Sequence, residues 1–168
     1  MSHRVLRRLA LTAAAALLPL LFLAARPSGD TSRVAGTYTM KYSQRHPIPV
    51  ADADGHVLIA TEATGTNRST GPFSFEDGAK VTIAETADMT QGNGPHQGYS
   101  IVSLNGDVRV SQWSGKLTTV LGADDQPATS FKGTWTTVKG PAGHGTYEGR
   151  ISGPDTYTVR WSGEVNGK

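Results

Sequence analysis

The sequence predicts an all-β fold: an antiparallel, eight-stranded closed barrel that follows an N-terminal apolar signal or anchor helix. After residue 26, up to eight short runs are separated by turn residues, with no convincing helix, a pattern typical of an antiparallel barrel or sandwich. Glycines recur inside these runs, where they allow a sheet to bend sharply. The chain has no cysteine and hence no disulfide, and closing the sheet would protect its edges. These observations favour the barrel.

The N-terminal segment has the composition of an export signal. Arg4, Arg7 and Arg8 precede an uncharged run over residues 9–25 that ends in small residues. A basic start, an apolar middle and a small-residue end describe a secretory signal peptide. The run is about 17 residues long, at the lower limit for a membrane-spanning helix. Cleavage after Ala25 is one interpretation, and an uncleaved N-terminal membrane anchor is the other.

Charge and composition divide the chain into a signal or anchor segment (1–26), a short polar linker (27–33) and a single β-barrel domain (34–168). The chain has 16 basic and 14 acidic residues, but four of the basic ones and none of the acidic ones lie in 1–26. The remainder has 12 basic against 14 acidic groups, a formal charge of −2. This balance argues against a nucleic-acid partner. We expect a secreted or cell-envelope location, with membrane contact only through an uncleaved N-terminal segment.

The first two strands are predicted from alternation and from turn residues. Apolar and polar side chains alternate from Tyr38 to Tyr42, which indicates a half-buried strand. The His-Pro-Ile-Pro run at 46–49 is expected to end it, because proline cannot donate to the ladder. Residues 52–55 (Asp-Ala-Asp-Gly) predict a turn, and 57–66, rich in β-branched residues, a second strand.

The middle of the chain predicts three more strands. A loop over 67–77 precedes a third strand over 80–89, and a glycine-rich turn over 91–97 precedes a fourth that begins at Tyr99. Asn105-Gly106 is the strongest short hairpin signal, because both central residues of a type I′ turn need positive φ. A long strand over 107–121, bent at Gly115, and a turn over 123–127 follow.

The C-terminal third predicts the closing corner of the barrel. Residues 131–153 describe a strand, a glycine-rich corner and a short strand around Tyr147, and 155–165 form the last strand. The tripeptide Trp-Ser-Gly occurs twice, at 113–115 and 161–163. Tryptophan and glycine share a face in each copy, so each indole is expected to cover the glycine of its own strand where that strand coils.

The same corner resembles a known group of barrels. The Gly-Thr-Trp run at 133–135 and the Gly-His-Gly-Thr-Tyr-Glu-Gly run at 143–149 are similar to bacterial allene oxide cyclase-like and dirigent-like proteins, over residues 131–165. The resemblance implies an eight-stranded barrel with a central cavity, often in a symmetric oligomer. In plant members, catalysis or substrate guidance takes place inside the barrel. The resemblance transfers neither an activity nor a functional residue to this chain.

Glu85 is the sharpest single candidate for chemistry. It shares its phase with Val81, Ile83, Ala87 and Met89, so it would point into the barrel. Desolvation there would raise its pKa and suit it to acid–base work. The alternative is a bulge or rim position that leaves Glu85 in water. Glu62 has the opposite phase to its apolar neighbours and is expected to face outward.

The stretch after the third strand is the second candidate. It contains an amide, an imidazole, another amide and a phenol (Asn93, His96, Gln97 and Tyr99), with glycines between them. Loops at barrel mouths often contact ligands, and Asp88 could orient the His96 ring. The alternative is an ordinary hairpin turn, which uses Asn, Gly and Pro for backbone reasons.

Other chemistries find little support. The histidines show neither of the spacings of paired metal ligands, residues 52–55 lack the later ligands of a calcium loop, and no G-x-S-x-G nucleophile motif occurs. We therefore predict no metal and no cofactor.

Three hypotheses remain for function. The first is a barrel that binds a small, partly apolar ligand in its interior or at its mouth, as a monomer or a homo-oligomer. The second is a cyclase or isomerase that uses the same cavity, with Glu85 or His96 as general acid–base. The third is a structural or interaction protein whose barrel is filled by side chains. A cavity of a few hundred Å³ with Glu85 at its base would favour the first two.

Overall fold

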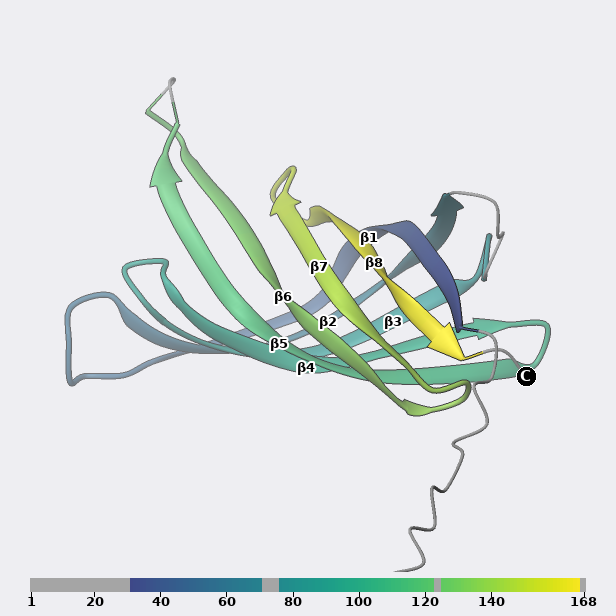
Figure 1. Cartoon of the computed structure of the whole chain (residues 1–168). Helices are drawn as coiled ribbons and strands as arrows, with labels where there is room; N and C mark the ends of the chain where they lie inside the picture. The colour runs from purple at the N-terminus through teal and green to yellow at the C-terminus, as the bar shows by residue number, and fades with distance from the viewer. Residues whose placement is uncertain (1–30, 71–75, 123–124, 167–168) are drawn as a thin grey trace, which may run out of the picture.

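The computed structural model describes residues 31–70, 76–122 and 125–166. Eight antiparallel strands form a closed barrel in which each strand pairs with its chain neighbours and β8 returns to β1 (Figure 1). The all-β prediction and the closed barrel are confirmed. The strands are β1 (Thr31–Pro49), β2 (His56–Thr70), β3 (Lys80–Thr90), β4 (Gly94–Leu104), β5 (Asp107–Leu121), β6 (Pro127–Lys139), β7 (Gly143–Ile151) and β8 (Thr156–Asn166).

The predicted signal or anchor segment, 1–26, lies outside the described residues. In the described ranges, no helix has the length and apolar character needed to cross a membrane. The linker was expected to reach residue 33, but Thr31 to Arg33 already pair with the end of β8. This pairing joins the two ends of the domain and has no local sequence signal.

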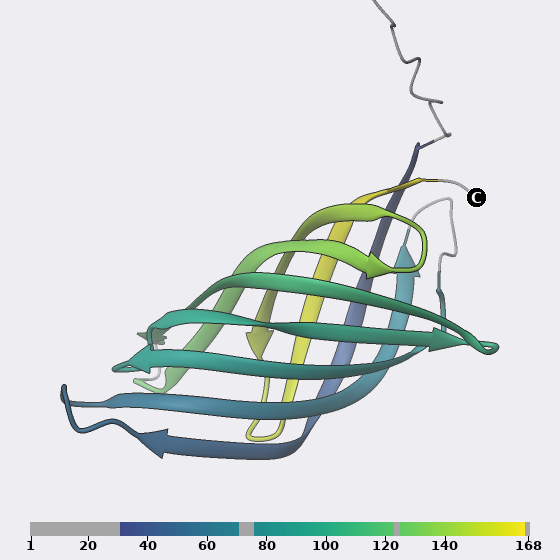
Figure 2. The same ribbon diagram turned by 90° about the horizontal axis from the view of Figure 1, so that it is seen from below.

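Alternation separates an inner from an outer face in every strand. Met40, Val81 and Val102 point inward and are at most 2% exposed. Glu85 lies on the inner face of β3 with its apolar neighbours, as its phase predicted, and Glu62 lies exposed on the outer face of β2. The view from below shows β2 to β5 side by side in one wall of the barrel (Figure 2).

Two predicted strand boundaries are wrong. The His-Pro-Ile-Pro run at 46–49 does not stop strand β1, which continues through it to Pro49, with Pro47 opposite Ile59. Beyond Lys41 it pairs with β2 alone, and a strand with one free side tolerates proline. Strand β2 likewise continues to Thr70, through the first part of the predicted 67–77 loop.

The glycine-rich turn predicted over residues 91–97 is shorter than its glycine content indicated. Strand β4 already begins at Gly94, because Gln91 and Gly92 make the turn with φ of 51° and 76°. The predicted hairpin at Asn105-Gly106 is confirmed by φ of 52° and 88°.

Several large aromatic rings of the wall cover glycines on a neighbouring strand. Trp113 lies over Gly98, and Trp161 over Gly36, each directly opposite in the ladder. A Cβ at Gly98 would come within 2.7 Å of the Trp113 ring. The expected cover of a glycine in the same strand is therefore wrong. Residues directly opposite across an antiparallel pair are closer than residues two apart along one strand.

The two ends of the barrel differ. We call the end with the β2–β3, β4–β5 and β6–β7 connections the base, and the other end the mouth. Inward side chains near the base, such as Ala79 and Val81, are fully buried, whereas Val57, Ile59 and Met89 near the mouth are half-buried. The β1–β2 and β5–β6 hairpins diverge at the mouth (Figure 1). Access to the interior is therefore easier from the mouth.

Candidate functional site

The barrel encloses a cavity of about 50 Å³. Its wall is mostly aromatic, and its polar members come from β1, β3, β4, β5, β7 and β8. Its lining includes a carboxylate, an imidazole and several phenols, among them Glu85, His96, Tyr42, Tyr147 and Tyr157.

Glu85 reaches this cavity because it occupies an inward position of β3. Its side chain is 12% exposed, and its Oε1 lies 2.7 Å from Nδ1 of His96. The Thr61 hydroxyl, on β2 directly opposite Glu85, donates to Oε2 at 3.2 Å. The carboxylate is thus desolvated and partly satisfied by two neighbours.

His96 continues the hydrogen-bonded chain across the interior. With the ring in its neutral form, the proton belongs on Nδ1, which faces the carboxylate. Nε2 then accepts from the Tyr147 hydroxyl at 3.0 Å. The Trp113 and Phe131 rings pack on the imidazole, with ring centroids 5.1 and 5.6 Å away. The result is a carboxylate–imidazole–phenol chain enclosed by aromatic rings.

Two further tyrosines, Tyr42 and Tyr157, line the same cavity. The Tyr42 and Tyr157 rings are 4.8 Å apart between centroids. Tyr157 is 3% exposed, and its hydroxyl has no hydrogen-bond partner in the described part of the chain. Burial, helped by the charge of Glu85, raises the pKa of Tyr157 well above its usual value and that of Tyr42 to about 12. Both phenols therefore stay protonated and can donate.

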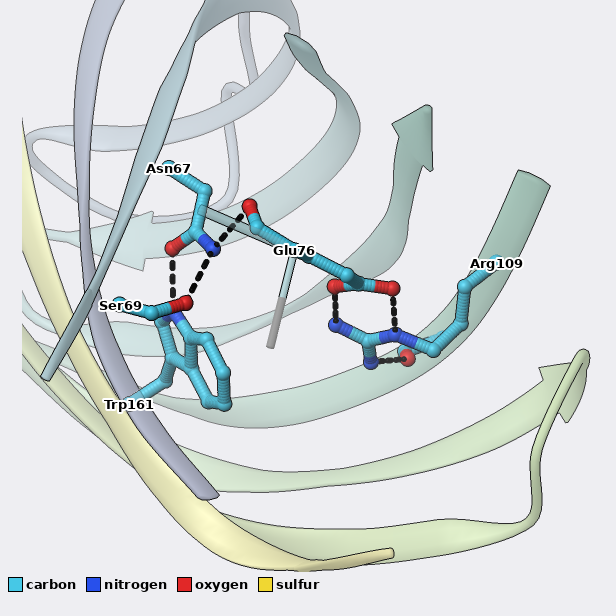
Figure 3. Close-up of polar contacts among 6 residues, drawn as sticks. Asn67, Ser69, Glu76, Arg109 and Trp161 are labelled. Carbon is cyan, nitrogen blue, oxygen red and sulfur yellow. Dashed lines mark hydrogen bonds and ion pairs between the residues drawn. The ribbon is translucent and has the colours of Figure 1, made fainter. Parts of the chain in front are cut away.

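A second polar cluster closes the base. Glu76, from the β2–β3 connection, forms a bidentate ion pair with Arg109 on β5, with N–O distances of 2.8 and 2.6 Å (Figure 3). A third guanidinium nitrogen donates to the Ser111 hydroxyl at 2.8 Å. Burial acts to lower the pKa of Arg109, but the hydrogen bonds and charges of Glu76 and Tyr38 outweigh it and raise that pKa. Arg109 therefore stays charged and paired.

Asn67 fixes the connection that supplies Glu76. Its Nδ2 donates to the Glu76 carbonyl at 2.8 Å and to the Ser69 hydroxyl at 3.3 Å, while its Oδ1 accepts from the Trp161 indole at 3.1 Å (Figure 3). Sequence reasoning missed this cluster. The signal was present in phase, since Arg109 and Ser111 occupy the same face of β5 as Trp113.

The structure brings only two of the six predicted ligand-binding residues together. Glu85 and His96 meet inside the barrel, and their contact was not foreseen. Asp88, Gln97 and Tyr99 lie on the outer face, Tyr99 with 46% of its surface exposed. Asn93 belongs to the β3–β4 turn, where its side chain bonds the backbone of Gln91 and Thr119.

The expected contact between Asp88 and His96 is not formed. Asp88 has the opposite strand phase to Glu85 and points outward, so it cannot meet an inward His96. It bonds Nε2 of His56 at 2.7 Å instead, and Asp52 bonds the other ring nitrogen of His56 at 2.5 Å. These three residues fasten the β1–β2 turn to β3 on the outside of the barrel.

Comparison with known proteins found no match: no protein-family model, no curated protein and no solved structure matches the chain. Fold and interior together define the class, an eight-stranded antiparallel barrel with a small, aromatic, carboxylate-bearing cavity. The resemblance to allene oxide cyclase-like and dirigent-like proteins stays a prediction.

Proposed function

We propose that the protein is an exported β-barrel that binds a small, partly apolar ligand inside the barrel, with the mouth as entrance. The observation that carries the proposal is the Glu85 carboxylate, held on the inner face of β3 against a cavity walled by aromatic rings. A carboxylate can accept about four hydrogen bonds, and His96 and Thr61 supply two. A polar group aimed into an apolar cavity is the usual anchor of a small-molecule site.

The size of the cavity limits the ligand. Its volume of about 50 Å³ is well below the few hundred Å³ of sites for drug-sized molecules. The proposal is therefore restricted to a molecule, or the end group of a molecule, with few non-hydrogen atoms. A barrel filled by its own side chains, with a structural or interaction role, is the competing outcome.

Native mass spectrometry of the protein purified from its own host tests the proposal. We expect a small bound mass in the wild-type protein and in a Glu62→Gln control, whose carboxylate lies outside the barrel, and its loss in Glu85→Gln. A wild-type protein without any bound mass would contradict it. The same spectra count the subunits of a proposed homo-oligomer. The mass of the mature chain distinguishes the two interpretations of the N-terminal segment, cleavage after Ala25 and retention as an anchor.

A cyclase or isomerase activity in the same cavity is the second candidate. It is favoured by the 2.7 Å hydrogen bond between Glu85 and His96, because a carboxylate and an imidazole in contact can hold and release a proton. Glu85→Gln separates the two functions. Retained ligand affinity with lost turnover indicates catalysis, and unchanged affinity and turnover exclude a role for Glu85.

A further inference from the structure

The cavity wall has the composition of a cation site. Around Glu85 stand the phenols of Tyr42, Tyr147 and Tyr157, and the pKa of each is raised first by burial and then by the charge of Glu85. Trp113 also lines the cavity. Aromatic faces attract ammonium ions and do so more strongly away from water. A carboxylate and several aromatic side chains that line one cavity offer both kinds of attraction at one place.

The hydrogen-bonding capacity of the polar groups in the cavity also favours an ammonium ligand. An ionised carboxylate only accepts hydrogen bonds, and a phenol oxygen can accept as well as donate. Glu85 can accept further hydrogen bonds, and the Tyr157 oxygen has no partner among the described residues. Both therefore match a ligand that is rich in N–H donors. A primary ammonium group has three donors and no acceptor.

Among the charged side chains near the cavity, Glu85 is the one that we expect to anchor a ligand. The Arg109 guanidinium is paired with Glu76 at the base. His96 places its Nδ1 2.7 Å from Oε1 of Glu85, which leaves Oε2 to Thr61 and to a ligand. Arg45 is exposed at the mouth, on the inner face opposite Thr61, with its guanidinium 4.7 Å from the Tyr42 ring centroid. A carboxylate ligand next to Glu85 would be repelled, because like charges brought together cost free energy.

We propose that the interior site binds a small primary ammonium ion, with Glu85 and Tyr157 as acceptors and the Tyr42, Tyr157 and Trp113 rings around the alkyl group. This inference rests on the proposed ligand-binding function and names the ligand class. The cavity of about 50 Å³ suits an ion as small as ethylammonium.

Three probes of similar size and different charge test the inference: ethylammonium, ethanol and acetate. Each is titrated into ¹⁵N-labelled protein, and shifts of the tryptophan indole and β3 amide signals are followed by NMR. A ligand with so few atoms is limited to about millimolar affinity. We expect ethylammonium to bind at least about tenfold more tightly than ethanol, and acetate to leave the indole signals unchanged.

Variants link the result to the named residues. Glu85→Gln keeps the side-chain volume and should weaken ethylammonium about tenfold or more, whereas the outward Glu62→Gln should not change it. Tyr157→Phe should weaken it by a smaller factor and gives a second test if Glu85→Gln does not fold.

The outcomes distinguish this inference from the proposed function. Equal binding of ethanol and ethylammonium, tighter binding of acetate, or ethylammonium affinity that survives both Glu85→Gln and Tyr157→Phe overturns the ammonium inference and leaves an interior site standing. Absence of binding by all three probes also overturns it. The proposed function fails separately, when the protein from its own host carries no bound molecule.

Discussion

At the scale of single residues, two tyrosines on adjacent strands have opposite roles. The Tyr147 hydroxyl bonds Nε2 of His96, and the Tyr157 hydroxyl has no partner in the described chain. Tyr147 fits because Gly115 and Gly133 lack side chains: a Cβ on either would lie 2.5 Å from its hydroxyl. Gly115 of β5 and Gly133 of β6 therefore make room for the interior hydrogen-bonded chain.

Tyr147→Phe should destabilise the protein by about 1–3 kcal/mol, because it leaves a buried imidazole nitrogen without a partner. Tyr157→Phe should leave stability unchanged or raise it slightly, because the hydroxyl that it removes is unsatisfied. The free energy of unfolding in urea measures both variants. Equal losses in the two would show that Tyr157 has a partner, such as bound water, that balances it.

At the scale of elements, the β1–β2 turn is held to β3 by a titratable group. Hydrogen bonds to Asp52 and then Asp88 raise the pKa of His56 above 6.5, and the hydrogen bond from His56 lowers the pKa of Asp52 below 3.8. A raised histidine pKa stabilises the fold below pH 6.5 and loses that effect as pH rises through the folded-state value. A lowered aspartate pKa stabilises above pH 3.8 and loses its effect as pH falls through the folded-state value.

The stability advantage of the wild-type protein over His56→Gln should therefore be largest between pH 3.8 and 6.5 and should shrink on either side. Unfolding midpoints in urea across this range measure it. His46→Gln is the matched control, because His46 bonds the amide of Gln44 and not a carboxylate. A difference that does not change with pH would contradict the fastening role of His56.

The β2–β3 connection closes the base through the Glu76–Arg109 pair. Arg109→Met should cost about 3–5 kcal/mol of unfolding free energy, because it leaves a buried carboxylate unpaired. Adding Glu76→Leu should recover most of the loss, because an apolar pair of similar volume often replaces a buried ion pair without cost. Chemical denaturation of the two single variants and the double variant measures the coupling, and purely additive losses would contradict it.

At the scale of the whole molecule, closure of the barrel brings together polar side chains from strands that are far apart in the sequence. Each of the eight strands has two hydrogen-bonded neighbours, so its inner face is enclosed by the other strands. The interior then contains two polar clusters, one ion-paired at the base and one centred on Glu85. The mouth is the less buried end, which gives the proposed site its direction of entry.

Strand phase and turn residues made part of this arrangement predictable from the sequence. The period-two pattern of β3 placed Glu85 inside, and Asn105-Gly106 fixed a hairpin, because side-chain alternation and positive φ are local properties. The same parity, applied to β4, would have separated His96 from Gln97 and Tyr99. It was hidden because the glycines before His96 resembled a longer turn.

The sequence by itself determined the class of fold and the strand phase that turns Glu85 inward. Only the tertiary structure decided which partners meet. Register set Thr61 opposite Glu85, closure brought Tyr147 of β7 to His96 of β4, and the β2–β3 connection carried Glu76 to Arg109, 33 positions along the chain. The reason is physical: alternation follows from local backbone geometry, whereas register and closure depend on hydrogen bonds between strands far apart in sequence.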